Sequence, residues 1–491
     1  MKSLVFSHTP TWPSHHAESV EIALTEHELG NDVVYLSCVG SLKTCPAYAV
    51  PSNEKCKICR SQTEYTKSKI LPSDIKFLDL DLKKTGYSYQ IFNSIYDLKI
   101  FEINKIPFGR MVFSTLTSEF NDSFFDVNEQ KDRINTLIEN AVGLYEYGLK
   151  IIQENEIDQV YVWNGRRSCD GPLLYAARTL GVKYSAFISG GKFNSLLIRH
   201  EALIVQDVPA AKIELLEVVN NIEQDKDRFN ITKGAINYFN YSSGNSGSNA
   251  VNHMGFYQFS KKFEKKQKNI KEFSEKRKII AVFTGTYSEY AGVPGYDNPD
   301  NFCNDFYEGV SFLQENFHRI NNAELRIRWH PNSRNLKGNE YEKLLSIIER
   351  GKEIINVHHI YPESNYNTYD LIEAADKCIG FGTSVSVETC LYGKPTIFIG
   401  NNMFEDLDCF YKPSSYEELI EILNSELEIK SFDHALAWGY YFSNFGTAMF
   451  SQLHQKKIGM FYYKGIRLAN FRFTIRLVLG RIKRTLLGLL N

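Results

Sequence analysis

The sequence of 491 residues contains no run of about 18 apolar residues, so we expect no membrane-spanning helix. Its net charge is only −2, which leaves no general electrostatic attraction to nucleic acid, and we expect no nucleic-acid partner. The first residues, MKSLVFSHTP, contain one lysine and an apolar stretch too short for a signal peptide. Together these absences predict a cytoplasmic protein.

A disulfide framework is also absent. The nine cysteines are an odd number and mostly scattered, which is typical of a reducing compartment. Four of them, Cys38, Cys45, Cys56 and Cys59, follow an expected strand with the spacing C-x6-C-x10-C-x2-C. In a reducing compartment this group fits a structural zinc ion better than disulfides, since four thiolates fill a tetrahedral site. Free thiols on a loop are the alternative, because the spacing is not that of a standard zinc finger.

The sequence does have a regular alternation of strands and helices. A chain of this length is too long for a single core. Near its start, a strand, a helix that stops at Gly30 and a second strand form a βαβ unit, and the pattern returns after residue 158. We therefore expect an N-terminal doubly wound domain over residues 1–250. Its expected strands are 3–7, 33–37, 159–163 and 183–188, with a helix through 173–180.

A second series follows residues 240–252, whose Ser, Gly and Asn content is that of a loop or linker. It predicts a second doubly wound domain over 275–430, followed by a helical return segment over 431–463. The fold class is therefore α/β, with two doubly wound Rossmann-like domains facing across a cleft. The expected strands are 278–285, 324–329, 354–358, 377–380 and 395–399, and the expected helices are 306–317, 340–350, 367–375 and 386–391.

The stretch LRIRWHPNSRN ends an expected strand on His330 and Pro331. Proline fixes its own φ and pushes the preceding residue towards extended backbone, so His330 is expected at a strand tip. Open α/β sheets bind ligands outside the carboxyl ends of their strands. The alternative is a turn in which the histidine only caps neighbouring backbone.

A second strand tip carries Gly382, Thr383 and Ser384, which open a helix with Glu388 in its first turns. Backbone N–H groups, hydroxyls and the positive end of the helix dipole favour an anion there. Ordinary helix capping explains the hydroxyls about as well. Because two strand tips of one sheet lie at the same edge, these residues and His330 together predict a phosphate site.

A His-Pro strand end, a Gly-Thr-Ser helix start with a later glutamate, and the turn Gly393-Lys394-Pro395 resemble the C-terminal domain of B-type, two-Rossmann glycosyltransferases. More narrowly, the chain is similar to bacterial capsule and lipopolysaccharide enzymes, including sialyl- and Kdo-transferases that use CMP-activated sugars. The stretch ALAWGYYFSNFGTAMF, residues 435–450, also resembles the aromatic helix that follows the donor domain in these enzymes. The resemblance implies that His330, Thr383 and Ser384 contact the donor phosphate and that Glu388 is a candidate for its ribose or sugar hydroxyls.

The resemblance implies an inverting, metal-independent glycosyltransferase with no cofactor required for catalysis. It would move a sugar from a nucleotide-activated donor, with a CMP-sugar favoured over other nucleotides, to a growing capsule, O-antigen or lipopolysaccharide glycan. Two alternatives stay open. A nucleotide-sugar epimerase of similar fold would act without an acceptor, and a non-catalytic subunit would bind glycan without releasing nucleotide.

The N-terminal domain should then supply the acceptor site and a general base. A base must reach the acceptor hydroxyl and have a tunable pKa, which His16 or Glu18 could satisfy in the first βα connection. The alternative is that Glu18 and Glu21 only complement the helix dipole. Asp170, in the strand-end stretch WNGRRSCDG, is a rival base. The same stretch offers an acceptor-binding set for an anionic group: Asn164, Arg166 and Arg167.

On the donor side, the stretch TGTYSEY follows the first strand of the second domain. Its glycine and hydroxyls could line the nucleotide site, with a glutamate near the reacting sugar. Ordinary turn chemistry explains the Thr and Ser residues nearly as well. The candidates are Thr284, Gly285, Ser288 and Glu289.

The C-terminal segment, residues 464–491, is basic, contains no acidic residue and interleaves its charges with apolar residues. This pattern predicts a basic amphipathic helix that attaches the protein to the inner face of the cytoplasmic membrane, where a lipid-linked glycan acceptor would lie. Packing of the helix on the protein body and binding of nucleic acid are the alternatives. The basic residues are Lys464, Arg467, Arg472, Arg476, Arg481, Lys483 and Arg484.

Overall fold

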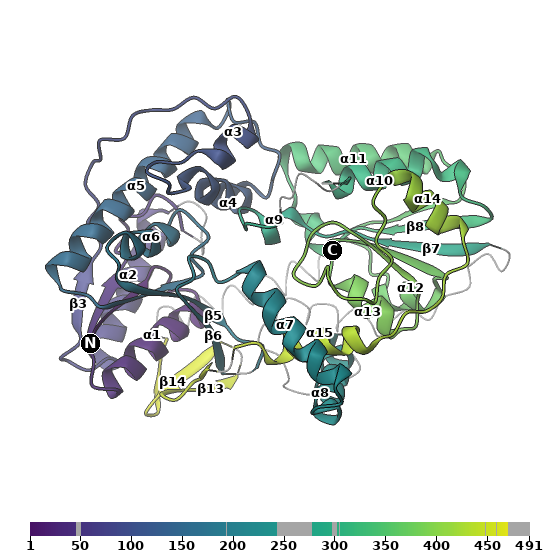
Figure 1. Ribbon diagram of the computed structural model, residues 1–491. Helices are drawn as coiled ribbons and strands as arrows, with labels where there is room; N and C mark the ends of the chain where they lie inside the picture. Colours follow the sequence, from purple (N-terminus) through teal and green to yellow (C-terminus); the bar gives the residue numbers. More distant parts are fainter. Residues whose placement is uncertain are drawn as a thin grey trace. The chain divides into compact units, whose positions relative to one another are not determined.

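The computed structural model describes residues 1–45, 51–192, 194–242, 277–296, 302–303, 305–446, 448–457 and 459–469. The chain divides into two compact units, each built around its own sheet (Figure 1). Among the described residues, unit 1 comprises those of Met1–Glu119, of Asp126–Val205 and from Gly446 onward, and unit 2 comprises those of Phe120–Phe125 and Gln206–Phe445.

The unit 1 sheet has the strand order β12-β6-β5-β4-β1-β2-β3. The chain runs from β1 to β3 on one side and from β4 to β6 on the other, so the strand order reverses between β1 and β4. The five strands from β1 to β5 are parallel, whereas β6 and β12 are antiparallel additions at one edge. The strands are β1 (Lys2–Ser7), β2 (Asp32–Ser37), β3 (Lys76–Asp79), β4 (Gln159–Trp163), β5 (Lys183–Ser189), β6 (Ser195–His200) and β12 (Ala448–Met449).

Helices cover both faces of this sheet, and alternate residues of each strand pack on opposite layers. In β1, Leu4 and Phe6 join a core with α5 and α6, whereas Val5 joins a core with α1. Burial on both faces explains the continuous apolar runs that predicted these strands. The helices are α1 (Pro13–Glu28), α2 (Asn53–Lys69), α3 (Ile95–Ile100), α4 (Phe108–Phe120), α5 (Lys131–Glu154) and α6 (Gly171–Thr179).

The unit 2 sheet is entirely parallel, with the order β11-β10-β7-β8-β9 and a reversal between β7 and β10. Ile280 and Val282 pack with α10, α11 and α14 on one face, and Ile279 and Ala281 pack with α12 on the other. The strands are β7 (Lys278–Phe283), β8 (Ala323–Arg328), β9 (Val357–Ile360), β10 (Lys377–Phe381) and β11 (Thr396–Ile399). The sheet is accompanied by α9 (Tyr287–Tyr290), α10 (Phe306–Glu315), η2 (Phe317–Arg319), η3 (Pro331–Asn335), α11 (Gly338–Lys352), α12 (Thr368–Ala374), α13 (Val385–Leu391) and α14 (Tyr416–Asn424).

Two doubly wound α/β units confirm the expected fold class, but the boundary between them differs from residue 250. The helices α7 (Val208–Glu223) and α8 (Arg228–Ser242) belong to unit 2, where they pack with α15 (Asp433–Asn444). The shared apolar cluster includes Leu215, Ala235 and Trp438, which are nearly or fully buried. The expected linker therefore falls after a helical pair of unit 2, and most of it lies outside the described residues.

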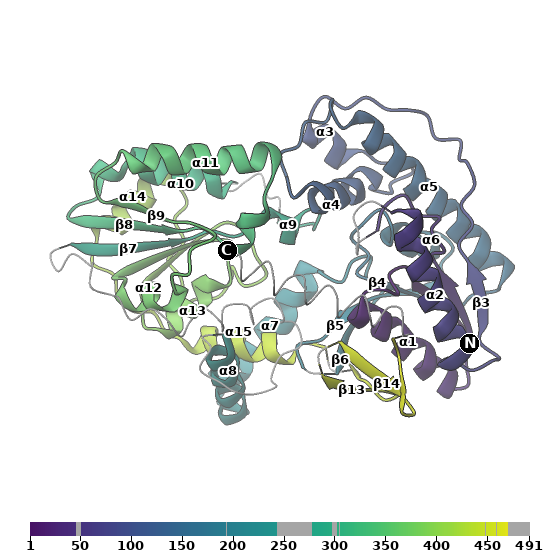
Figure 2. The ribbon, with the colours of Figure 1, turned by 180° about the vertical axis from the view of Figure 1, so that it is seen from behind.

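The expected helical segment 431–463 is only partly helical. After α15 the chain returns to unit 1 and forms β13 (Leu453–Lys457) and β14 (Met460–Tyr463), an antiparallel pair beside α1 (Figure 2). The carboxylate of Glu21 on α1 accepts the backbone N–H groups of Ser451, Gln452 and Leu453. These bonds, and burial of Leu453 and Phe461 in the α1 core, favour strands over a helix.

The expected tail helix is wrong at its start. Lys464 and Gly465 form a turn, and β15 (Ile466–Arg467) pairs with β14. The carbonyl of Arg467 accepts from Tyr65 Oη at 2.9 Å, and that of Leu468 accepts from Gln62 Nε2 at 2.6 Å, so both are tied to α2. Residues 470–491 lie outside the described residues. Within the described part of the chain, no helix combines the length and apolarity needed to cross a bilayer.

Candidate active site

The carboxyl edge of the unit 1 sheet brings the residue after β1 close to the turn after β4. His8 follows β1, and Cys169 and Asp170 end the turn, just before α6. Asn164 (φ 64°) and Gly165 (φ 82°) reverse the chain after β4. A Cβ on Gly165 would lie 2.2 Å from the carbonyl oxygen of Leu203, so only glycine fits there. The cluster therefore sits where the strand order reverses, the usual ligand position in open α/β sheets.

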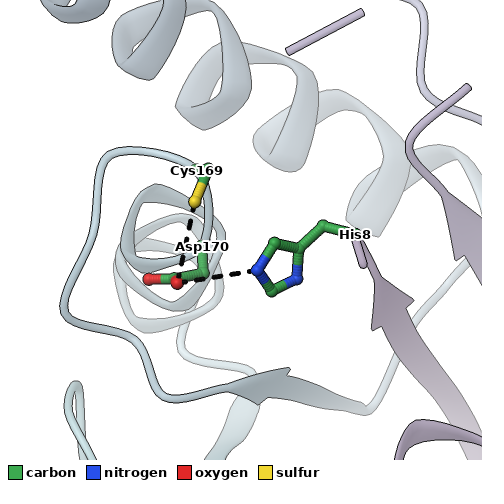
Figure 3. Close-up of side chains that lie close together, drawn as sticks. All are labelled: His8, Cys169 and Asp170. Carbon is green, nitrogen blue, oxygen red and sulfur yellow. Dashed lines mark hydrogen bonds and ion pairs between the residues drawn. The ribbon is translucent and has the colours of Figure 1, made fainter. Parts of the chain in front are cut away.

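His8, Cys169 and Asp170 point toward one another (Figure 3). Asp170 Oδ2 lies 3.8 Å from His8 Nε2 and 3.8 Å from Cys169 Sγ. The other oxygen, Asp170 Oδ1, accepts the backbone N–H of Arg167 at 2.8 Å. All three clustered side chains are almost completely buried. Asp170 thus has one oxygen fixed by a strong donor and one facing a histidine.

Burial sets the protonation of this pair. It lowers the pKa of His8 to about 3, with the charge of Arg167 adding to the effect. It raises the pKa of Asp170 to about 7, against the opposing hydrogen bond and charge of Arg167. His8 is therefore neutral at pH 7, and Asp170 exchanges its proton near neutrality. A general base needs this property.

The same three side chains offer metal ligands, since one atom from each lies within 4.8 Å of the others. The charges of Arg167 and Arg166 act on Asp170 from close by. Two nearby cations oppose a divalent ion and favour an anionic substrate group. The cluster therefore fits proton transfer beside an anion better than it fits a metal centre.

The predicted acceptor-binding residues lie in the same turn. Arg166 donates its backbone N–H to Asn164 Oδ1 at 3.3 Å, and Asn164 donates its own to the carbonyl of Phe187 on β5. Asn164 and Arg166 are buried and Arg167 is half-buried. All three therefore lie in the same turn as Asp170. Their binding of an acceptor stays a prediction.

The two other predicted bases have structural partners. Glu18 accepts from Trp163 Nε1 at 3.0 Å and from Ser189 Oγ, which fastens α1 to β4 and β5. His16 Nε2 hydrogen-bonds Thr66 Oγ1 on α2 at 2.8 Å. Burial lowers the pKa of His16 to about 3 and raises that of Glu18 to about 7. Both carboxylate oxygens of Glu18 are occupied, so Asp170 is the better placed base.

Sequence reasoning missed His8. A usable signal was present, because His8 follows a buried strand and precedes a Thr-Pro pair, much as His330 follows a strand and precedes Pro331. Both histidines lie at the tip of a strand in a doubly wound sheet. A search for strand-terminal histidines would have found both.

In unit 2, the residues after β7 and β8 are tied together. The backbone N–H of His330 donates to Thr284 Oγ1 at 3.1 Å. His330 Nδ1 accepts the backbone N–H of Asn332 at 3.1 Å, at the start of the short helix that begins with Pro331. Burial and the charge of Arg328 lower the pKa of His330 to about 4. The neutral ring therefore accepts at Nδ1 and carries its proton on Nε2. His330 can therefore cap the backbone through Nδ1 and still donate a hydrogen bond to a ligand through Nε2–H.

The tip of β10 approaches the tip of β7 closely. Tyr290 Oη and Asn402 Nδ2 both donate to the carbonyl of Gly382, at 3.3 and 2.8 Å. A Cβ on Gly285 would lie 3.3 Å from the carbonyl of Phe381, so a larger residue would crowd the two tips. The sequence-predicted Thr284, Gly285, Gly382 and His330 thus share one edge of the sheet, at its reversal point.

The remaining predicted donor residues lie around this edge. Asn332 Nδ2 donates to Glu289 Oε1 at 3.4 Å, which places Glu289 beside the His330 turn. Ser288 Oγ lies 3.2 Å from Thr286 Oγ1. Thr383 is buried and Ser384 half-buried at the start of α13, which has only seven residues. The predicted phosphate contact therefore depends on side chains more than on a long helix dipole.

Glu388 on α13 is buried. It accepts from Tyr369 Oη at 2.6 Å, and burial raises its pKa to about 7. The nearby Gly380 has no room for a side chain, because a Cβ would lie 1.8 Å from Ser386 Oγ. The packing of α13 on β10 is thus tight, and a role of Glu388 toward a ribose stays a prediction.

The predicted four-cysteine group lies in unit 1, at the end of β2 and the start of α2. None of the four is in a disulfide, and Cys59 is buried whereas Cys38, Cys45 and Cys56 are half-buried. No three of these sulfurs come within 4.8 Å of one another among the described residues. The four side chains therefore do not form a closed metal geometry in this structure.

No family model and no curated protein matches the chain. Solved structures that resemble it include KpsC of Thermosulfurimonas dismutans, a β-Kdo 2,4-transferase, with 15% identity, a TM-score of 0.34 and coverage of 68% of this chain and 94% of that chain. A UDP-GlcNAc 2-epimerase of Methanocaldococcus jannaschii has 11% identity, a TM-score of 0.31 and coverage of 90% and 98%. That of Neisseria meningitidis has 11% identity, a TM-score of 0.27 and coverage of 89% and 97%. At such low values the likenesses establish no activity for this chain.

Proposed function

We propose that this chain is a glycosyltransferase that moves a sugar from a nucleotide-activated donor to a growing surface glycan. The observation that carries the proposal is that each of the two units has a polar cluster at the reversal point of its sheet. One cluster offers phosphate-type donors around His330, and the other offers the buried Asp170 beside His8. A transferase has two substrates, a donor and an acceptor, and each substrate needs its own binding site.

Unit 2 would bind the donor. The Nε2–H of His330 and the hydroxyls of Thr383 and Ser384 would donate to the donor phosphate and stabilise the charge that develops on it as the sugar leaves. Thr284 supports this role, because its bond to the His330 backbone fixes the position of the ring. A CMP-sugar is the favoured donor, from the resemblance of these motifs, with Glu388 toward the ribose. The stabilising groups are side chains, so the proposed reaction needs no metal ion.

Unit 1 would bind the acceptor. Asp170 would accept the proton of the acceptor hydroxyl while that oxygen bonds to the anomeric carbon of the donor sugar. The bond between the anomeric carbon and the phosphate oxygen breaks in the same step, and the nucleotide leaves with the electron pair. Displacement from the opposite face inverts the anomeric centre. Arg166 and Arg167 would hold an anionic group of the acceptor.

A nucleotide-sugar epimerase is the alternative within the enzymes. An epimerase would use the cluster of unit 2 and would need no acceptor. It would give no role to the cluster of unit 1. A glycan-binding subunit is the non-catalytic alternative, and it would need no base beside the acceptor. Neither alternative explains the presence of both clusters as well as a transferase does.

Product analysis tests the proposal. The full chain is first titrated with CMP, CDP, UDP and GDP, and the sugar form of the tightest binder is then incubated with and without a glycan acceptor. We expect nucleotide release only when acceptor is present, without any need for added Mg²⁺ or Mn²⁺. Conversion of the free nucleotide sugar without acceptor would identify an epimerase, and the absence of any turnover would identify a binding subunit.

We further propose that residues 470–491 attach the enzyme to the inner face of the cytoplasmic membrane. Their arginines and lysines carry no acidic neighbours and alternate with apolar residues. Such a segment is attracted to anionic lipids. A lipid-linked glycan acceptor would be met there.

A further inference from the structure

We infer that Arg328, the last residue of β8, supplies the positive charge that holds the donor phosphate at the carboxyl edge of the unit 2 sheet. The inference rests on the proposed function, because it adds a residue to the proposed donor site. His330, Thr383 and Ser384 can donate hydrogen bonds to a phosphate, but a neutral imidazole and two hydroxyls carry no charge. A phosphate that stays ionised in a partly buried site needs a cation beside it.

The guanidinium of Arg328 is buried and is held by backbone oxygens alone. The residue is only 6% exposed. Its Nη1 donates to the carbonyl of Tyr361 at 2.6 Å and its Nη2 to that of Ser364 at 3.4 Å, both in the loop after β9. Its Nε has no hydrogen-bond partner among the described residues. These bonds fix the guanidinium in place, yet they leave N–H donors unused and the charge unneutralised.

Arg326, two residues earlier in β8, shows how the same face of this strand accommodates an arginine that has a counter-ion. Its guanidinium forms an ion pair with the buried carboxylate of Glu324. Arg328 forms no ion pair with any carboxylate of the described residues, and the charge that acts on it comes from the exposed Glu363. A buried charge without a close counter-ion is costly to maintain. A bound anion would remove this cost.

Arg328 stays charged at neutral pH. Burial lowers its pKa to about 10, and the charge of Glu363 acts against this fall. The guanidinium is therefore protonated at pH 7. A positive charge at a buried site attracts an anion more strongly than the same charge does in water.

Arg328 and His330 lie on the same face of the unit 2 sheet. Side chains alternate along an extended chain, and Trp329 between them packs on the opposite face with α10 and α11. The backbone of His330 is still extended, with φ −59° and ψ 134°. Val385, the first residue of α13, packs with α12 on the face that Arg328 shares. Figure 1 shows α12 and α13 on one side of this sheet and α10 and α11 on the other.

The three kinds of group would divide the recognition of the phosphate. The Nε2–H of His330 and the hydroxyls at the start of α13 would give directed hydrogen bonds, and Arg328 would give the opposite charge. When the bond to the sugar breaks, negative charge grows on the leaving phosphate. A cation that is already fixed by two carbonyls stabilises this charge without rearranging. Arg328 should therefore matter for the phosphate and not for the base or the ribose.

The test separates the phosphate from the rest of the nucleotide. Calorimetric titration of the full chain compares CMP, CDP, UDP and GDP with their own nucleosides, and adds pyrophosphate as a probe that has no base. Arg328→Gln should raise the Kd of the tightest nucleotide and of pyrophosphate about ten- to a hundredfold, and leave the Kd of the nucleoside unchanged. Arg328→Lys, which keeps a positive charge, should give an intermediate Kd.

The matched control is Arg326→Gln, which removes an arginine of the same strand that already has a carboxylate partner. It should keep the wild-type ratio between the Kd of the nucleoside and the Kd of the nucleotide, even where it lowers the melting temperature. If Arg328→Gln does not fold, Arg328→Met is measured in its place, because an apolar side chain of similar length often replaces a buried charge without loss of stability.

The inference is overturned if the folded Arg328 variant keeps the Kd of both the nucleotide and pyrophosphate within a few-fold of wild type. It is also overturned if the Kd of the nucleoside rises as much as that of the nucleotide, because Arg328 would then only tie down the loop after β9. Either result leaves the proposed function standing if the wild-type chain transfers sugar. A wild-type chain that binds pyrophosphate through Arg328 but transfers no sugar would overturn the proposed function and keep the inference. A wild-type chain that binds neither nucleotide nor pyrophosphate would overturn both.

Discussion

The backbone N–H of His330 donates to the hydroxyl of Thr284 at 3.1 Å and joins the tip of β8 to the tip of β7. The ring is fixed from its other side, because Nδ1 accepts from the backbone of Asn332. Because its backbone N–H and its Nδ1 are both hydrogen-bonded, the imidazole loses little conformational entropy when it binds a ligand. Its Nε2–H is therefore preorganised to donate a hydrogen bond. His330 is only half-buried, so its replacement would remove no fully buried core side chain.

His330→Ala should therefore weaken nucleotide binding. A hydrogen bond to a charged phosphate contributes roughly 1.5–3 kcal/mol, so calorimetric titration should show a Kd about ten- to a hundredfold higher. His358→Ala, which removes an exposed histidine of β9, should leave the Kd unchanged. An unchanged Kd in His330→Ala, together with a lower melting temperature, would show that His330 only caps the backbone.

Asp170→Asn should abolish most of the transfer rate with little change in nucleotide affinity. Loss of a general base typically lowers the rate by a factor of about a hundred to ten thousand, because the base acts only as the transition state forms. The pKa of Asp170 is raised to about 7, and the carboxylate is the active form, so kcat of the wild-type enzyme should rise with pH through about 7. Stopped assays from pH 5.5 to 8.5 would measure this rise of kcat with pH.

The variant's pH profile separates a base from a structural carboxyl. In Asp170→Asn the residual rate should no longer rise across the same pH range. A variant that keeps a rate within a few-fold of wild type would remove Asp170 from the mechanism. His16→Ala, which changes a buried neighbour of Thr66, should lower the rate only as far as it lowers the folded fraction.

Glu18→Gln should leave the transfer rate within a few-fold and change how stability depends on pH. Burial raises the folded pKa of Glu18 from its ordinary 4.5 to about 7. Its contribution to stability is therefore complete below about 4.5 and is lost as pH rises through about 7, by up to roughly 3 kcal/mol. Urea unfolding of wild type at pH 5 and pH 8 should show this loss, and Glu18→Gln should show less of it.

The matched control is Glu28→Gln, an exposed glutamate at the end of the same helix. It should retain the wild-type difference between the two pH values. If Glu18→Gln instead loses the transfer rate by a hundredfold while its unfolding curve matches wild type, Glu18 is the base, and its two hydrogen bonds serve catalysis.

The sequence predicted the parallel strands well because burial on both faces leaves near-continuous apolar runs. The β4 range 159–163 was predicted residue for residue. The start of β9 was misplaced by three residues, because Ile354 and Ile355 read as apolar strand. In the structure Ile355 is 81% exposed, and Asn356 (φ 67°) completes a turn before Val357. Local composition cannot reveal such an exposed isoleucine.

Contacts between segments that lie far apart in the chain could not be predicted from the sequence. Glu21 reads as a dipole-complementing residue, yet its carboxylate binds backbone around Ser451, some 430 positions away. Asp122 likewise caps α11 by accepting from the backbone N–H groups of Asn339 and Glu340, which lie more than 200 positions further along the chain. The strand-tip motifs were found because each needs only its neighbours in sequence. Which tips meet depends on strand order, which one sequence does not fix.

The basic C-terminal segment has a part that packs on unit 1, residues 464–469, and a part outside the described residues, 470–491. The two parts can be removed separately to test the membrane proposal. Ile466 and Arg467 pair with β14, and the carbonyls of Arg467 and Leu468 accept from Tyr65 and Gln62. Removing residues 464–491 should therefore lower the melting temperature, because two hydrogen bonds and the buried Leu468 are lost. A truncation that begins at residue 470 leaves these contacts intact.

Removing only residues 470–491 should move the protein from the membrane fraction to the soluble fraction without lowering its melting temperature. Each basic residue near an anionic surface contributes about 1 kcal/mol, so raising the salt concentration should also release the intact chain from anionic vesicles. Replacing Arg472, Arg476 and Arg481 by Gln should weaken vesicle binding while keeping the length. Transfer to a short water-soluble acceptor should survive the truncation, whereas transfer to a lipid-linked acceptor should fall. If the intact chain never sediments with anionic vesicles and the shorter truncation unfolds at lower temperature, the segment packs on the body and the membrane proposal is wrong.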